Sequence, residues 1–236
     1  MTQRLQKLIA EAGLCSRRTA EQWIREGRIK VNGIPAVLGQ QADPAADQIL
    51  VNGLPLSPTP EKIYIMLNKP RGFLTTLADD RGRSTVAELV GEIPERIFPV
   101  GRLDYDSDGL LLMTNDGALT RALTHPSHEV DKVYLTRVRG DIARAIPQLT
   151  GPMEIDGCTV RPAQVEVAGP NLLTITIHEG RNRQVRKMCA KAGLEVRRLT
   201  RIAEGPLRLG ELPPGRWRFL TDHEIRSLRN LISGPL

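Results

Sequence analysis

Aromatic residues and cysteines are both scarce in this chain. Aromatic side chains make up 3% of its 236 residues, too few for a sheet that recognises single-stranded RNA by stacking one base after another. The three cysteines, Cys15, Cys158 and Cys189, are odd in number and far apart. This spacing argues against a disulfide framework and against a zinc site.

Features of membrane proteins and of several enzyme classes are also missing. No apolar run approaches the ~20 residues of a membrane-spanning helix, and the start Met1-Thr2-Gln3-Arg4 lacks the apolar core of a signal peptide. Nucleotide-binding glycine loops, the hydrolase nucleophile elbow and the zinc-protease motif do not occur in the sequence. We therefore expect a cytoplasmic protein that has no membrane partner.

The positive charge is concentrated in two segments. Residues 1–33 contain seven Lys and Arg against three acids, and residues 181–201 contain eight against one. The two segments together carry a net charge of +11, whereas the whole chain carries +6. Such clustering indicates an anion-binding surface, although for either segment alone a solvated helix face is the alternative.

The N-terminal part predicts a small helix–helix–hairpin unit over residues 1–48. Apolar residues fall on one stripe of residues 4–13, Ser16 can cap a second helix over residues 17–26, and residues 28–31 alternate as a strand before an Asn-Gly turn. The basic residues of this unit lie largely off the apolar stripe: Arg4, Lys7, Arg17, Arg18, Arg25, Arg28 and Lys30.

The rest of the chain predicts a linker and an α+β domain. Residues 49–61 are rich in proline and lack periodicity, which is typical of a semi-extended linker. From residue 62 to 236, strands and helices mix without regular βαβ alternation, so we expect a mixed, largely antiparallel sheet flanked by helices. The expected strands are 63–67, 110–114, 130–138, 160–167 and 172–178, and the expected helices are 116–124, 141–149, 182–193 and 222–231.

An acidic turn precedes one of these strands. Asp104, Asp106 and Asp108, followed by Gly109, match the opening of a calcium-binding loop. The twelfth position of that loop is Asn115, where a bidentate Glu is required. No helix is expected directly before the turn either. These departures argue against a metal site.

A second hypothesis makes Asp104 a nucleophile and the two following acids turn formers. Arg102 lies two residues before Asp104, and an adjacent cation keeps a partly buried carboxylate ionised. A lone Asp beside an Arg is also typical of a structural ion pair. The residues of the turn alone leave both interpretations open.

A third motif is the run from Glu179 to Met188, EGRNRQVRKM. It places a glycine and then a helix start beside several cations, and Arg183, Arg186 and Lys187 share one helix face. A helix N-terminus with guanidinium groups is typical of phosphate binding. We interpret this segment as a contact to the phosphate backbone of RNA or DNA.

Taken together, these motifs resemble those of the bacterial rRNA pseudouridine synthases of the RsuA/RluB family. The likeness rests on the N-terminal run RLQKLIAEAGLCSRRTAEQWIREGRIKVNG, on Met66–Gly72, on Gly101–Asp104 with the following GLLLMTNDG, on Lys132-Val133-Tyr134 and on EGRNRQVRKM, in this order. It implies an S-four-type RNA-binding domain over 1–48 and a pseudouridine synthase catalytic domain over 62–236.

The resemblance also implies roles for individual residues. Asp104 is expected to attack the target uridine, Tyr134 to stack on the flipped base, Arg186 to pair with Asp104, and Arg102 to support the loop or contact RNA. The reaction is an isomerisation, so no cofactor or metal is expected. The remaining residues expected to contact RNA are the seven basic residues of the N-terminal unit and Arg181, Arg183, Lys187 and Lys191.

The amino-acid sequence of the motifs favours the branch of the family that modifies 23S rRNA. The branch that acts on 16S rRNA is the alternative, and a non-catalytic rRNA-binding factor for ribosome assembly is a second. One departure stands out, since Arg183 occupies the position where the family usually has a histidine. We expect a monomer whose partner is ribosomal RNA, either free or within a pre-ribosomal particle.

Overall fold

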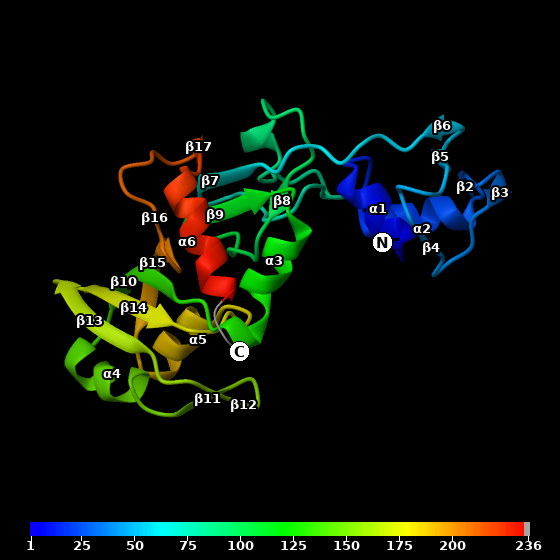
Figure 1. Ribbon diagram of the computed structural model, residues 1–236. Coiled ribbons are helices and arrows are strands. Elements are labelled where there is room, and N and C mark those ends of the chain that lie inside the picture. Colours follow the sequence, from blue (N-terminus) through cyan, green and yellow to red (C-terminus); the bar gives the residue numbers. More distant parts are fainter. Residues whose placement is uncertain (234–236) are drawn as a thin grey trace. The chain divides into compact units, whose positions relative to one another are not determined.

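The computed structural model describes residues 1–233, which form two compact units (Figure 1). The first unit comprises Met1–Ile63 together with the short segments Glu92–Ile97 and Asn115–Gly117. The second unit contains Tyr64–Gly91, Phe98–Thr114 and the chain from Ala118 onward. Within the described residues, no helix is both long enough and apolar enough to span a membrane.

The first unit confirms the predicted helices and strand. Ser16 caps the second helix, because its hydroxyl accepts a hydrogen bond from the backbone amide of Thr19 at 3.0 Å. Leu5 and Ile9 of the first helix pack against Ile24 of the second in a common core. The elements are α1 (Leu5–Glu11), α2 (Arg17–Arg25), a sheet of β3 (Ile34–Pro35), β2 (Ile29–Val31), β5 (Ile49–Val51) and β6 (Leu54–Pro55), and the pair β1 (Gln3–Arg4) and β4 (Gln41–Ala42).

The N-terminal sheet continues past residue 48, where the sequence places the start of the linker. β5 pairs with β2 through Lys30 and Leu50, and Ile49 and Val51 are buried. The proline at position 55 lies in β6 at the edge of this sheet, where a missing amide hydrogen removes no ladder bond. The prolines of residues 49–61 therefore made a short strand pair read as part of the linker. Residues 56–63, which contain no strand, connect this sheet to β7.

The second unit contains a nine-stranded sheet that confirms the predicted mixed, largely antiparallel arrangement. Its main order is β13-β14-β10-β15-β9-β7-β17, with β16 beside β15 and β8 beside β9. Only β9 and β15 pair in parallel among the described strands, at Thr200 and Asp108. The strands are β7 (Tyr64–Lys69), β8 (Phe98–Pro99), β9 (Asp108–Thr114), β10 (Lys132–Arg139), β13 (Gln164–Gly169), β14 (Leu172–Ile177), β15 (Glu195–Glu204), β16 (Leu207–Arg208) and β17 (Trp217–Phe219).

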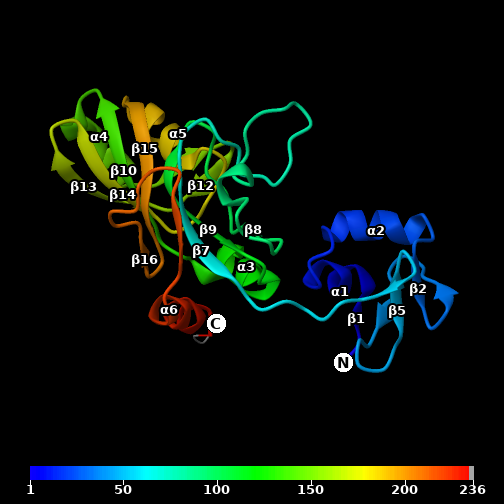
Figure 2. The same cartoon turned by 90° about the horizontal axis from the view of Figure 1, so that it is seen from above.

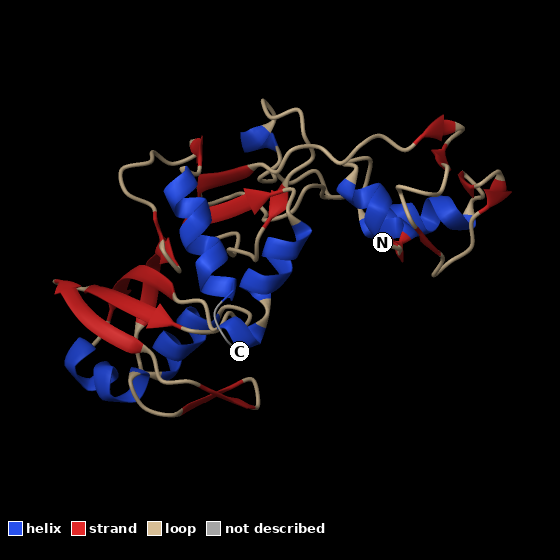
Figure 3. Ribbon diagram, viewed as in Figure 1, coloured by secondary structure: helices blue, strands red, loops and turns tan. Residues whose placement is uncertain are grey.

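Helices cover this sheet at both of its ends (Figure 3). Side chains from alternate positions of β7 and β9, including Met66 and Leu112, pack against Leu119 of α3 and Leu228 of α6. The views of Figures 1 and 2 place α4 and α5 at the other end, near β10, β13 and β14. The helical elements are η1 (Glu88–Val90), α3 (Gly117–Thr124), η2 (Pro126–His128), α4 (Ile142–Leu149), α5 (Gln184–Lys191) and α6 (Asp222–Ser233).

One predicted strand is divided in two. The sequence predicts a strand over 160–167, but β12 (Cys158–Val160) ends before residue 161 and β13 begins at Gln164. β12 instead forms a separate hairpin with β11 (Met153–Ile155). Pro162 lies in the break. A proline has no amide hydrogen to donate to a sheet ladder, which explains why the strand is interrupted there.

A glycine permits the parallel contact between β9 and β15. Gly109 has a φ of +108°, and a Cβ atom at this position would lie 2.2 Å from the carbonyl oxygen of Arg201. The same atom would lie 2.6 Å from the amide nitrogen of Arg201. Any side chain would therefore push the two strands apart.

We expect Gly109→Ala to lower the free energy of unfolding by at least about 3 kcal/mol, because backbone strain and steric overlap add. Gly157→Ala is the matched control, since Gly157 also has a positive φ, +73°, but has open space around it. The control should lose about 1–2 kcal/mol. Urea denaturation of both variants measures the difference, and equal losses would contradict the close approach of β9 and β15.

Candidate active site

A cleft of about 480 Å³ lies in the second unit. Its walls come from the loop before β9, from β10, from the segment between β14 and α5, and from β15. Five of the residues predicted from sequence line it, namely Arg102, Asp104, Tyr134, Arg181 and Arg183. The structure therefore brings together motifs that are up to about 80 residues apart in the chain.

The backbone of the loop that carries Asp104 is held by a buried lysine. Lys69, the last residue of β7, donates hydrogen bonds from Nζ to the carbonyl oxygens of Pro70 at 3.0 Å, Asp104 at 3.1 Å and Ser107 at 2.9 Å. An ammonium group has three donors, so these three carbonyls use its full capacity. Burial lowers the pKa of Lys69 from 10.5 to about 8, and the nearby carboxylates, led by Asp108, oppose this shift.

A threonine fixes the other side of the same loop. The hydroxyl of Thr75 donates to the carbonyl oxygen of Leu103 at 2.7 Å and accepts from its amide at 3.2 Å. Leu103 is itself buried. The position of Asp104 is therefore fixed by the residue before it as well as by Lys69.

Asp104 is partly buried, with its side chain 23% exposed, and its carboxylate forms an ion pair with Arg183. Arg183 Nη1 lies 3.8 Å from Asp104 Oδ2, which is an ion pair without a close hydrogen bond. The sequence predicts a pair between Arg186 and Asp104, but the carboxylate that Arg186 contacts is that of Asp106, at 3.4 Å from its Nε. Arg186 also donates from Nη2 to the backbone oxygen of Asp106 at 2.8 Å.

Asp106 is therefore more than a turn former. Arg183 binds its carboxylate with both Nη atoms, at 2.9 and 2.8 Å. These hydrogen bonds, followed by the charges of Arg186 and Arg183, lower the pKa of Asp106 despite its partial burial. The residue anchors the loop that carries Asp104 to α5, a role that local sequence patterns do not reveal because its partners lie 77 and 80 residues away.

Asp108 is also bound by an arginine. Its Oδ2 atom accepts a hydrogen bond from Nε of Arg198 at 3.0 Å. Each of the three acids of the turn thus has an arginine as its partner: Arg183 lies beside both Asp104 and Asp106, and Arg198 binds Asp108. Within residues 1–233, no group of three or more His, Cys, Asp or Glu side chains could hold a metal.

Arg183 has a strained backbone. It precedes α5 with a φ of +54°, a left-handed conformation that is uncommon for a residue with a side chain. Such strain occurs at functional sites where the surroundings hold the residue in place. Here the bidentate contact with Asp106 supplies that restraint, so the residue where the family pattern has a histidine links the two main motifs of the site.

The floor of the cleft contains Tyr134 of β10 and two charged residues that the sequence did not single out. Arg201 is 1% exposed and donates from Nε to the carbonyl oxygen of Leu110 at 2.8 Å. Glu204 is also buried, and its carboxylate lies 3.2 Å from Arg201 Nη2. Burial raises the pKa of Tyr134, so its hydroxyl stays protonated at neutral pH.

Arg201 and Glu204 were missed because they belong to a strand whose pattern looks ordinary. The inward position of Arg201 follows from the alternation of buried residues in β15, where Leu199 and Ala203 are also buried. A charged residue at an inward position of a strand is the sequence feature that points to it. The role of Glu204 has no such local marker.

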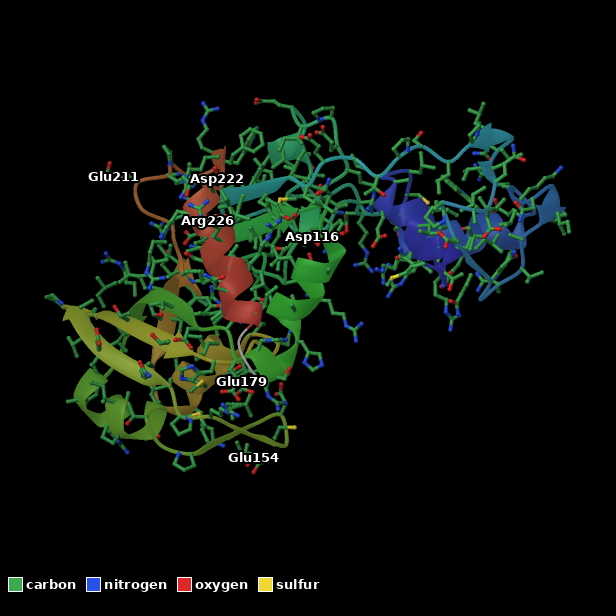
Figure 4. The ribbon with its side chains drawn as sticks, viewed as in Figure 1. Asp116, Glu154, Glu179, Glu211, Asp222 and Arg226 are labelled. Carbon is green, nitrogen blue, oxygen red and sulfur yellow. The ribbon has the colours of Figure 1, made fainter. Side chains whose placement is uncertain are left out.

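The other predicted cations of α5 and its approach contact protein groups. Lys187 pairs with Asp156 and Lys191 donates to the backbone oxygen of Glu154 at 3.0 Å, so both contact the β11–β12 hairpin, on which Figure 4 labels Glu154. Arg181 is exposed and pairs at 3.2 Å with Glu179, which Figure 4 labels.

Arg102 is exposed at the cleft, and its guanidinium has no protein partner among the described residues. It is therefore available to a phosphate group without first breaking a contact within the protein.

In the first unit, three predicted cations are already engaged. Arg4 donates to the backbone oxygen of Gly39 at 3.4 Å, and Lys7 Nζ lies 3.6 Å from the Glu11 carboxylate. The guanidinium of Arg28 stacks over Trp23, with its Cζ atom 4.4 Å from the ring centroid. The remaining four are exposed and form no ion pair within residues 1–233: Arg17, Arg18, Arg25 and Lys30.

Comparison with known proteins supports the same two parts of the chain. A model of the RNA pseudouridylate synthase family matches residues 63–191, and a model of the S4 domain matches residues 3–44. Ribosomal large subunit pseudouridine synthase B of Bacillus subtilis is 43% identical over 237 residues, covering 97% of this chain and 96% of that protein. The dual-specificity RNA pseudouridine synthase RluF of Escherichia coli is 37% identical, covering 97% and 79%.

A solved structure shows the same fold over nearly the whole chain. The crystal structure of a pseudouridylate synthase, 31% identical, superposes with a TM-score of 0.69 and covers 95% of this chain and 99% of the other. The resemblance to the RsuA/RluB family predicted from the motifs is thereby confirmed.

The contribution of Lys69 to stability should depend on pH. Its pKa is about 8 in the folded protein against 10.5 ordinarily, so between these values the unfolded chain binds more protons than the folded protein. The free energy of unfolding then rises with pH. We expect the difference in unfolding free energy between wild type and Lys69→Met to shift in favour of wild type as pH rises from 8 to 10.5. Denaturant titrations across this range test it, and a flat or falling difference would contradict it.

Proposed function

The chain belongs to the RNA pseudouridylate synthase family, and from this premise we propose that it isomerises one uridine of 23S rRNA to pseudouridine with Asp104 as the nucleophile. The observation that carries the proposal is the position of Asp104. It lines the cleft on a loop held by Lys69 and Thr75, with a protonated Tyr134 on the floor below.

The reaction requires a base that leaves the RNA stack and a carboxylate that attacks it. Asp104 attacks either the anomeric carbon of the ribose or the pyrimidine ring, and the glycosidic bond breaks in both cases. The uracil turns and its C5 atom bonds to the ribose. The bond to Asp104 breaks, which regenerates the carboxylate, and the proton on C5 is lost while N1 gains one. Atoms and electrons balance within the nucleotide, so the reaction consumes no co-reactant.

The arginines around the loop leave the Asp104 carboxylate accessible. Arg183 directs its two short hydrogen bonds to Asp106 and stays 3.8 Å from Asp104. The Asp104 oxygens are therefore not held in a bidentate pair. Tyr134 would stack on the extruded uracil, and Arg102 would contact the phosphate next to it.

RNA binding would come from the S4 domain and from the cations at the cleft. Extracting a base costs a few kcal/mol of stacking and pairing. Phosphate contacts at Arg17, Arg18, Arg25 and Lys30 can offset this cost, because these side chains are exposed and carry no ion pair in the described part of the chain. The binding of rRNA would take place in the cytoplasm and would need only one copy of the chain.

The choice of 23S rRNA rests on the 43% identity to the large-subunit enzyme of Bacillus subtilis across nearly all of both chains. A 16S rRNA target is the alternative, as is a non-catalytic assembly factor. These alternatives differ in where, and whether, a pseudouridine disappears when the nucleophile is removed.

We expect Asp104→Asn to reduce pseudouridine formation by at least about a thousandfold while RNA binding is retained, because the amide is a poor nucleophile of the same shape. Pseudouridine mapping of 23S and 16S rRNA, in cells whose only copy carries the substitution, should show one 23S uridine left unmodified. Asp80→Asn is the control, since Asp80 is exposed and lies outside the cleft.

Three outcomes would count against parts of this proposal. Pseudouridine formed by the Asn variant would exclude Asp104 as the nucleophile. An unmodified uridine in 16S rRNA would move the target to the small subunit. An rRNA map that is unchanged even when the protein is absent, with rRNA binding intact, would favour the assembly factor.

The role of the S4 domain can be measured by salt dependence. Replacing Arg17 and Arg18 by Gln should weaken rRNA binding and flatten the slope of log affinity against log salt by about one unit for each arginine. Arg144→Gln with Arg226→Gln is the matched control, since both are exposed arginines of the second unit that lie outside the cleft (Figure 4 labels Arg226). Equal slopes for the two double variants would contradict a role of the S4 domain in phosphate binding.

A further inference from the structure

Two buried polar atoms at the floor of the cleft lack hydrogen-bond partners. Arg201 Nη2 and Glu204 Oε2 lie 3.2 Å apart, but neither takes part in a hydrogen bond of acceptable geometry in the structure. Their side chains are 1% and 7% exposed, respectively. A buried donor or acceptor without a hydrogen bond destabilises the protein, so a ligand that hydrogen-bonds both atoms would be favoured.

The two residues belong to the cleft in which the base would be held. Arg201 and Glu204 line the same cleft as Asp104 and Tyr134. Arg201 cannot turn away freely, since its Nε is bonded to the carbonyl oxygen of Leu110.

The edge of uracil complements this pair. It presents the N3–H donor between two carbonyl oxygens, O2 and O4, which are acceptors. We propose that Glu204 and Arg201 determine the specificity for uracil, with Glu204 accepting the N3 hydrogen and Arg201 Nη2 donating to the neighbouring carbonyl oxygen. This inference rests on the proposed function, since it assumes that the extruded base enters this cleft.

Cytosine is rejected by the same pair. Its N3 atom carries a lone pair, which would face the Glu204 carboxylate, and the amino group that replaces O4 would place a second donor against the guanidinium. A site that fixes a donor and an acceptor in this way discriminates strongly, because the wrong base leaves buried polar groups unpaired. Stacking on Tyr134 alone would not separate the two pyrimidines.

The arrangement also suits the turn that the base makes during the reaction. Uracil exchanges N1 for C5 by turning about the axis through N3 and C6. This turn leaves the N3–H group in place and exchanges O2 with O4. Glu204 therefore keeps its hydrogen bond throughout, and Arg201 meets a carbonyl oxygen both before and after. The detached base is retained without a contact that its rotation must break.

The alternative is that Arg201 and Glu204 form a structural ion pair that only supports the sheet. Buried pairs of this kind often contribute little net stability, and removing one partner destabilises the protein in either case. Stability measurements thus cannot separate the two roles. The preference for uracil over cytosine can, because a structural pair has no reason to affect it.

The test uses the full-length protein and the nucleotides uridine, cytidine and pseudouridine 5′-monophosphate as probes, with binding followed by NMR titration. Wild type should bind the uridine nucleotide about tenfold or more tightly than the cytidine nucleotide, the effect of one unmatched buried hydrogen bond. Pseudouridine 5′-monophosphate should bind within about threefold of the uridine nucleotide, because its N3–H is kept.

The variant Glu204→Gln should reduce the uridine preference to about threefold or less, since a glutamine amide can turn its NH₂ group toward the N3 lone pair of cytosine. Glu129→Gln is the matched control, because Glu129 also lines the cleft but is exposed and paired with Arg161. The control should keep the wild-type preference.

The inference is overturned if wild type shows no preference for the uridine nucleotide, a result that does not depend on whether any variant folds. It is also overturned if Glu204→Gln binds the nucleotides with an unchanged ratio. Either result, together with normal pseudouridine formation in rRNA, would leave the proposed function standing. Uridine preference without any pseudouridine formation would instead refute the function and leave the recognition of uracil intact.

Discussion

The loop that bears Asp104 depends on one buried ammonium group. Lys69, at the end of β7, donates to three carbonyl oxygens around this turn and so fixes its backbone. A charge is expensive to bury unless it is hydrogen-bonded, and the three carbonyl oxygens supply those bonds here. Thr75 and the contact of Arg183 with Asp106 restrain the same loop from other elements.

The arginines around the turn make their close contacts with Asp106 and not with Asp104. Asp106 receives the short, bidentate contact of Arg183 and the contact of Arg186, so the strong charge-assisted hydrogen bonds are made by a residue to which we assign no step of the reaction. Asp104, the proposed nucleophile, keeps a single cation at 3.8 Å. Its oxygens are thus not held by a short hydrogen bond from that arginine and can approach a carbon atom.

Local patterns predicted most of the fold and part of the site. The Ser16 cap, the two N-terminal helices and the mixed sheet followed from short-range rules, and Asp104 and Tyr134 followed from motifs. The contact of Arg186 with Asp106 could not be predicted in this way, because the two residues are 80 positions apart. The sequence around an aspartate in a turn does not show whether a distant cation binds it. Likewise, the strand pair over residues 49–55 was hidden by prolines that occupy a sheet edge.

The parallel pairing of β9 with β15 has a consequence for how the protein acquires activity as it is made. The contacts that complete the site join positions 77 to 91 residues apart, ending at Arg201. Contacts of such separation form late in folding, because a long loop must close first. A nascent chain that has released the Asp104 loop therefore has no working cleft, and the enzyme becomes competent only when nearly all of it has been synthesised.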